Sequence, residues 1–262
     1  MLFIIFLFFY LLTLSGNVVI ITVICLEPRL QTPVYFFLAN LSFLGRCYTS
    51  TNVPQMLSNL VGVRKKISFT GCATQMYFSL SFGIIECVLH GVMAYDQYVA
   101  MYHQLHYKAI MNRVTCVPLG ITFWMSSFLS SLVINALTSS FPYCGPSVLN
   151  HLHCEVLTIL RLAFTDTSFL KMVAFVFSSI TVFIPFLFIM VSYAHIRLSV
   201  LGRHSTTGRC RAFSMCVSHL TVVALFYERA IFVYMRPQSG ASQDVGKVSP
   251  LVYTVITPMF NP

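Results

Sequence analysis

The sequence predicts an all-α membrane protein, a bundle of seven transmembrane helices, and three observations carry this prediction. Of 262 residues, 57% are hydrophobic and only 9% are charged, which leaves too little polar surface for a soluble protein of this size. The apolar residues are gathered into blocks of bilayer-spanning length, and a helix needs about 20 residues to cross the hydrocarbon layer. The blocks lack the short apolar–polar alternation that marks the strands of a membrane barrel.

Each block is expected to form one helix, because a segment inside lipid must satisfy its own backbone hydrogen bonds. We find no internal repeat, low-complexity stretch or separate soluble domain, which favours a single domain, 1–262. The seven expected spans are approximately 2–25, 34–62, 72–102, 114–137, 169–195, 212–235 and 248–262.

Taken in order, the blocks differ in what interrupts them. The first contains no charged residue, and the third ends in the polar pair Asp96 and Gln97. Pro54, Pro118 and Pro185 lie inside the second, fourth and fifth blocks, where they predict kinks rather than breaks. The last block has about fifteen residues, short of the roughly 20 needed to cross, so we expect an incomplete seventh helix in a truncated chain or fragment.

The orientation of the bundle is not set by its positive charges. With the N-terminus outside, seven Lys and Arg residues fall on each side, so the usual excess of positive charge on the cytosolic side is absent. The net charge of +9 is scattered over both faces, which excludes a nucleic-acid footprint. Cys72, Cys144 and Cys154 share one face and can be bridged if that face is oxidising, so we expect it to be extracellular.

Six short motifs, in order and on the right spans, resemble those of one family. They are "GNVVI" around Asn17, "TPVYFFLANLSFL" from Thr32, "MAYDQYVAM", "SYAHI", "RAFSMCVSHL" and "TPMFNP". Over its whole length the chain resembles an olfactory receptor, a branch of the rhodopsin-like G-protein-coupled receptors. The resemblance implies a plasma-membrane receptor with an extracellular N-terminus, a small volatile hydrophobic ligand and a stimulatory heterotrimeric G protein of the olfactory type. It implies no cofactor.

The resemblance assigns coupling to the end of the third span, where the family has Asp-Arg-Tyr and this chain has Asp96, Gln97 and Tyr98. It adds Tyr193, Asn261 and Pro262 to the same set. An arginine carries a permanent charge and five donors, and Gln97 has neither. Hydrogen bonds to charged groups contribute roughly 1.5 to 3 kcal/mol, so we expect impaired or altered coupling. The alternative is that Gln97 is a tolerated polar residue at a helix end.

A second departure lies in the second span, where the family usually has an acid and this chain has Gly45. The family's acid on the third span is retained as Glu86, and Arg46 adds a cation beside Gly45. A charge at mid-bilayer costs about 2.5 to 3.5 kcal/mol on insertion scales. We therefore expect Arg46 either to pair with Glu86 or to face elsewhere and snorkel.

The resemblance also implies a disulfide between Cys72 and Cys154. A second family pair would join Cys144 to position 164, which is Phe164 here, so an unpaired extracellular thiol is expected. The run "HLHC" ending at Cys154 could hold a soft metal. Once Cys154 is bridged only two adjacent imidazoles remain, so no metal site is expected.

Helical spacing on the third span predicts one stripe that faces the bundle, and by resemblance the fifth and sixth spans complete a ligand pocket. Apolar walls with a few hydroxyls suit a small volatile ligand. The alternative is that many of these side chains serve helix packing alone. The expected ligand-binding residues are Ser79, Leu80, Gly83, Ile84, Cys87, Phe177, Ser178, Thr181, Tyr227, Ala230, Ile231 and Tyr234.

Other functional classes fit the sequence less well. The acids and histidines lie on separate spans without a catalytic arrangement or phosphate-binding loop, so no enzyme is expected. The intramembrane charges Arg46, Glu86, Glu228 and Arg229 are of the kind that mark transport paths, which leaves a small-solute or proton transporter as the alternative. Transporters usually contain repeated halves, and none is found here. A non-signalling fragment or pseudogene product is the other alternative.

Overall fold

The computed structural model describes residues 2–61, 67–143, 154, 156–160, 167–201 and 216–228. Its helices are α1 (Leu2–Leu26), the short 3-10 turn η1 (Pro28–Leu30), α2 (Pro33–Val61), α3 (Phe69–Tyr102), α4 (Tyr107–Ile110), α5 (Arg113–Ser139), α6 (Val156–Leu160) and α7 (Ser168–Leu201). A further apolar helix, Cys216–Glu228, is called helix 216–228 below.

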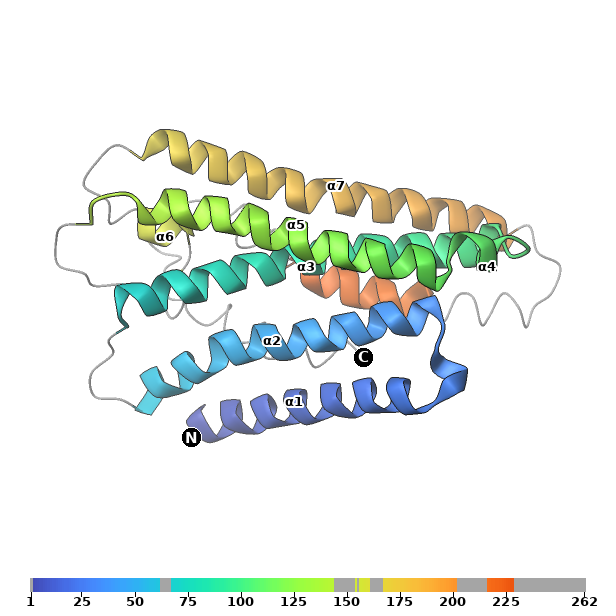
Figure 1. The fold of residues 1–262 in the computed structure, drawn as a ribbon, viewed down its shortest axis with the longest axis horizontal. Coiled ribbons are helices and arrows are strands. Elements are labelled where there is room, and N and C mark those ends of the chain that lie inside the picture. The colour runs from blue at the N-terminus through green and yellow to red at the C-terminus, as the bar shows by residue number, and fades with distance from the viewer. Residues whose placement is uncertain are drawn as a thin grey trace.

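The long helices lie side by side along one direction, as Figure 1 shows. Every regular element in the described ranges is helical, which confirms the predicted all-α class. The expected seventh span, 248–262, lies outside the described residues.

Local sequence sets where the helices begin. The Ser68 hydroxyl accepts from the amide of Gly71 at 3.0 Å, so α3 starts slightly before the apolar block. The side chain of Asn112 accepts from the amide of Thr115 at 2.9 Å at the start of α5. Each of these caps satisfies one of the amides that the first helical turn leaves without a partner.

The internal prolines do not break their helices. Pro54 lies within α2, Pro118 within α5 and Pro185 within α7, and each helix continues on both sides of its proline. This agrees with the prediction that freed carbonyl groups are tolerated where neighbouring helices pack closely.

The central element is α3, which packs against α2, α5 and α7, while α1 packs on α2. One apolar core joins α2, α3 and α5 and includes the fully buried Phe37 and Ile85. A second core joins α3, α7 and helix 216–228 and includes Ile189 and Tyr227. Because α3 contributes to both cores, its position is set by α2, α5, α7 and helix 216–228.

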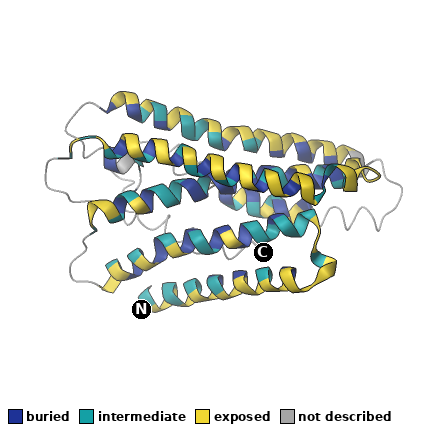
Figure 2. Ribbon diagram, viewed as in Figure 1, coloured by how far each residue is buried: buried dark blue, intermediate teal, exposed yellow. Residues whose placement is uncertain are grey.

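The outer faces of the bundle are apolar. Phe169 is 73% exposed and Leu129 is 64% exposed, and Figure 2 shows such exposed positions along the outward sides of the helices. By length and composition, α1, α3, α5 and α7 can cross a membrane. The α2 helix is long enough but more polar, because it carries Arg46 and Asn52. An apolar exterior around a partly polar interior is the arrangement of a multi-pass membrane protein.

Candidate functional site

The expected functional residues fall at two places along α3. We call the part around Cys72 to Cys87 the disulfide half, and the part around Asp96 to Tyr98 the Asp96 end. The disulfide half faces α2, α7 and helix 216–228, and the Asp96 end faces α4, α7 and the start of helix 216–228.

At the Asp96 end, Asp96 is buried, with 1% of the residue exposed. Its Oδ1 atom accepts a hydrogen bond from the hydroxyl of Tyr107, in α4, at 2.9 Å. Burial of Tyr107, followed by the nearby negative charge and hydrogen bond of Asp96, raises the pKa of the Tyr107 phenol above its ordinary value. The phenol is therefore a stable donor at neutral pH, and it ties the loop after α3 to the end of that helix.

The next residue, Gln97, is bonded to a different helix. The hydroxyl of Tyr193, in α7, donates to Gln97 Oε1 at 2.7 Å and is also hydrogen-bonded to His219 Nδ1. A tyrosine hydroxyl has only one proton, so Tyr193 donates to Gln97 and accepts from the Nδ1–H group of His219. This Gln97–Tyr193–His219 chain links α3, α7 and helix 216–228.

The remaining coupling residues are placed less tightly. Tyr98 is half-buried, and its ring stacks on Tyr102 with centroids 5.4 Å apart. It also meets the ring of His195, in α7, edge-on at 6.0 Å. Asn261 and Pro262 lie outside the described residues.

In the disulfide half, the predicted stripe of α3 begins with a polar contact at Ser79 and ends in an apolar core at Cys87. The hydroxyl of Ser79 donates to Asn52 Oδ1, in α2, at 2.9 Å. A methyl group added at Gly83 would meet no atom within 4 Å, so open space adjoins the helix there. Cys87 is buried in the same core as Tyr227. Leu80 and Ile84 share this stripe, the first half-buried and the second buried.

The expected pocket residues of α7 and helix 216–228 lie at partly buried to buried positions. Phe177, Ser178 and Thr181 are half-buried, and the Thr181 hydroxyl donates to the carbonyl of Phe177 at 2.8 Å. Tyr227 is 2% exposed, and its hydroxyl is buried without a hydrogen-bond partner. Ala230, Ile231 and Tyr234 lie outside the described residues.

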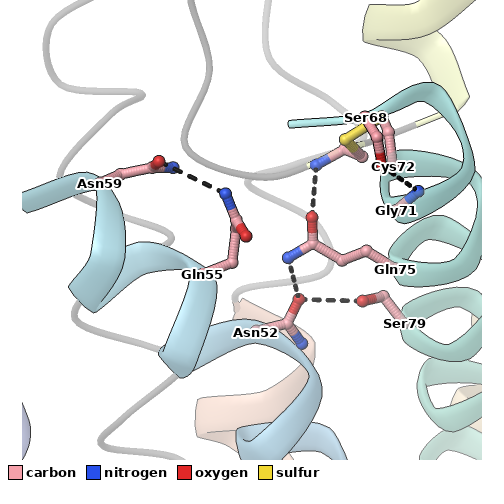
Figure 3. The surroundings of a disulfide bond; sticks show 9 residues. Asn52, Gln55, Asn59, Ser68, Gly71, Cys72, Gln75 and Ser79 are labelled. Atoms are coloured by element: carbon pink, nitrogen blue, oxygen red, sulfur yellow. Dashed lines mark hydrogen bonds between the residues drawn. A yellow bond between two sulfur atoms is a disulfide. The ribbon is translucent and has the colours of Figure 1, made fainter. Parts of the chain in front are cut away.

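The disulfide implied by the resemblance is present: Cys72, near the start of α3, is bonded to Cys154. Figure 3 shows the polar network that surrounds it. The side chain of Gln75 accepts from the amide of Cys154 at 3.4 Å and donates to Asn52 Oδ1 at 3.5 Å. Asn52 thus links α2 both to α3 and, through Gln75, to the bridged loop. Cys144 lies outside the described residues.

Two outcomes were expected for Arg46, pairing with Glu86 or facing elsewhere. The Nε atom of Arg46 is buried without a hydrogen-bond partner. Glu86 is itself buried on α3, 6% exposed. The described part of the chain also contains no cluster of three or more His, Cys, Asp or Glu side chains that could hold a metal ion.

Four side chains of these sites were not selected from the sequence: Asn52, Gln75, Tyr107 and His219. Their roles depend on neighbours far along the chain, such as Gln75 with Cys154, which lie 79 residues apart. His219 belongs to the motif "RAFSMCVSHL". The motif therefore pointed to this residue, but not to its hydrogen-bond partner Tyr193.

Comparison with known proteins extends over the whole molecule. A family model described as olfactory receptor matches residues 6–262. The chain is 47% identical over 261 residues to olfactory receptor 10A7 of Homo sapiens, covering 100% of this chain and 83% of that protein. It is 47% identical over 264 residues to olfactory receptor 10Q1, covering 100% and 82%, and 46% identical over 253 residues to olfactory receptor 13F1, covering 97% and 79%, both from Homo sapiens.

Proposed function

Because this chain belongs to the olfactory receptor family, and is thus an odorant-binding G-protein-coupled receptor rather than an enzyme, we propose that its ligand enters between α3, α7 and helix 216–228. The ligand class is a small volatile hydrophobic molecule. The G protein is the stimulatory heterotrimer of the olfactory type, and coupling to it is weakened by Gln97.

The open space beside Gly83 is the observation that carries the pocket. It lies on the α3 stripe that runs down to Cys87, which packs in one core with Val182 of α7 and with Tyr227. Walls of this kind bind a small ligand mainly by burial, with few polar contacts to fix its orientation.

The hydroxyls of the expected pocket residues differ in what they can offer. The protons of Ser79 and Thr181 are already donated within the protein, to Asn52 and to a backbone carbonyl, so these two groups can only accept from a ligand. The Tyr227 hydroxyl has no partner and can donate. This favours a ligand with one oxygen acceptor, such as a carbonyl, ether or alcohol, on an apolar frame.

The bonding at the Asp96 end supports the proposal of weakened coupling. Asp96 is bonded to α4 and Gln97 to α7, so the neighbouring side chains are held by different elements. An amide has no charge with which to exchange partners between Asp96 and a G protein, whereas an arginine has a fixed charge and five donors. The expected result is a receptor that binds odorant and transmits the signal poorly.

We propose that the disulfide end of the bundle faces outward. The N-terminus lies at that end, where α3 also begins, as Figure 1 shows. Disulfides form and persist in oxidising compartments, so this end would be extracellular in the plasma membrane and α4 would face the cytosol.

The pocket is tested by an odorant panel on cells that display the chain, with cyclic AMP as the readout. Gly83→Leu fills the open space and should abolish the response while surface staining persists. Tyr227→Phe should weaken the response to ligands with an oxygen acceptor more than the response to hydrocarbons. Gly16→Leu is the matched control, because Gly16 also adjoins open space but lies on α1. Equal responses in the Gly83 and Gly16 variants would contradict the proposed pocket.

A further inference from the structure

In the described part of the chain, His90 is the most deeply buried titratable side chain that the proposed function does not use. It lies on α3 between the two functional regions, is 0% exposed, and neither of its ring nitrogens has a hydrogen-bond partner. Buried polar groups in folded proteins almost always have partners. The two buried, unpartnered nitrogens of His90 are therefore an exception that calls for an explanation.

A second imidazole lies opposite, on helix 216–228. The rings of His90 and His219 have centroids 5.7 Å apart, and His219 Nε2 is also buried without a partner. The other nitrogen of His219 is bonded to Tyr193, which donates its own proton to Gln97. Nδ1 of His219 therefore carries the proton, and in the neutral ring the lone pair lies on Nε2.

This arrangement matches the environment of a metal-binding histidine. Such residues usually engage the second ring nitrogen in a hydrogen bond, which fixes the tautomer and the orientation of the ring. For His219 the Gln97–Tyr193–His219 chain provides that bond. A neutral His90 also presents one lone pair, whichever nitrogen carries its proton.

The ring separation agrees with two imidazoles on one ion. A metal–nitrogen bond of about 2.0 to 2.1 Å places a ring centre about 3.2 Å from the ion, so two rings lie roughly 5.2 Å apart at a tetrahedral angle and about 6.4 Å apart when opposed. The observed 5.7 Å falls inside this interval. The ring of Phe226 lies 5.2 Å from that of His90 and forms an apolar wall beside the pair.

We propose that His90 and His219 form a two-imidazole site for a single transition-metal ion, of the zinc or copper class that imidazole prefers. The ion joins α3 to helix 216–228 within the membrane. Small ligands complete its coordination, because no group of three or more His, Cys, Asp or Glu side chains gathers in the described part of the chain.

Gln97 has a specific part in this proposal. An arginine has no acceptor, so in a Gln97→Arg variant the Tyr193 hydroxyl would turn its proton toward His219 Nδ1. The proton of neutral His219 would then move to Nε2, and the lone pair that binds the ion would be lost. The glutamine that weakens coupling is therefore also the residue that prepares His219 for a metal.

The test is equilibrium binding of Zn²⁺ to the purified full chain in lipid nanodiscs, which requires no signalling and so stands or fails apart from the proposed function. The expected result is one high-affinity ion that is lost in His90→Leu and in His219→Leu. Gln97→Arg should lower the affinity by about 10- to 100-fold, the usual effect of changing a residue that supports a metal ligand. His195→Leu, which removes an exposed histidine of α7, should change nothing.

Two results would overturn the site. One is the absence of Zn²⁺ binding by the folded wild-type chain, which would leave only water between the rings. The other is binding that persists in both His variants, which would place the ion elsewhere. Copper(II) resonance spectra of the wild-type chain add a readout that does not depend on whether variants fold. Coupling to two ring nitrogens supports the pair, and coupling to one or none contradicts it.

Discussion

The two regions of α3 are held in different ways. The disulfide half is fixed by a covalent bond and a network of neutral groups. The Asp96 end is held by side-chain hydrogen bonds to helices that follow α3 in the sequence. Cys72 is bonded to Cys154, and Gln75 and Ser79 both reach Asn52. At the other end, Asp96 is bonded to Tyr107 and Gln97 to Tyr193. Because a covalent bond resists separation more than hydrogen bonds do, we expect the first region to be the more rigid of the two.

The largest expected effect is on the covalent tie. Cys72→Ser should lower the stability of the chain by about 2 to 5 kcal/mol, the usual cost of removing a native disulfide from a small domain. Thermal unfolding in detergent and surface staining measure the loss. Cys25→Ser, at an exposed free cysteine, is the control and should have no effect. A stable, surface-displayed Cys72 variant would show that hydrogen bonds alone hold the disulfide half.

The next effect concerns the buried acid. Tyr107→Phe removes the donor to Asp96 and should cost about 1.5 to 3 kcal/mol, because the bond involves a charged group. Adding Asp96→Asn should recover part of this loss, since the neutral side chain no longer needs the donor as strongly. Unfolding midpoints of the single and double variants measure the coupling. Strictly additive losses would argue that the contact adds nothing to the Asp96 end.

A smaller effect is expected in the neutral network. Ser79→Ala removes one neutral hydrogen bond to Asn52 and should cost about 0.5 to 1.5 kcal/mol. Ser126→Ala, on the exposed side of α5, is the matched control for loss of a hydroxyl. Unfolding of the two variants under the same conditions gives the difference. A loss as large as that of Tyr107→Phe would remove the distinction between the two regions.

The smallest expected change is in titration. The pKa of Tyr107 is raised by burial and by Asp96, so its phenol stays protonated where exposed tyrosines ionise. Its folded pKa exceeds its unfolded value, so its contribution to stability is present below the ordinary tyrosine pKa and is lost as the pH rises through the raised value. Tyrosinate absorbance of wild type and Tyr107→Phe checks this, and a difference confined to the highest pH is expected. A difference near the ordinary tyrosine pKa would contradict it.

The long described helices could be predicted from the sequence because lipid forces each apolar block to satisfy its own backbone. The Cys72–Cys154 bond followed from resemblance, and the structure contains it. Tyr193 was expected in the same coupling set as Gln97, but its bond to Gln97, across 96 residues, was not predicted. Tyr107, the partner of Asp96, was not selected, because it reaches Asp96 only after the chain has turned.

Arg46 and Glu86 illustrate the same limit. From the sequence Arg46 was expected either to pair with Glu86 or to face elsewhere, because a hydrophobic pattern gives helix faces only approximately. Whether two long side chains on α2 and α3 meet depends on the relative rotation and register of the helices, which packing decides. Ser79 was selected as a ligand contact from helical spacing, and that spacing could not show that its hydroxyl donates to Asn52.

The most direct test of the account is odorant-driven nucleotide exchange on the olfactory-type G protein, measured with the purified chain and its Gln97→Arg variant in nanodiscs. If an intact pocket is joined to a weakened output, the two proteins should bind the same odorant with similar affinity, and exchange should be several-fold faster in the arginine variant. Equal exchange rates at equal odorant occupancy would contradict the assignment of the weakness to Gln97.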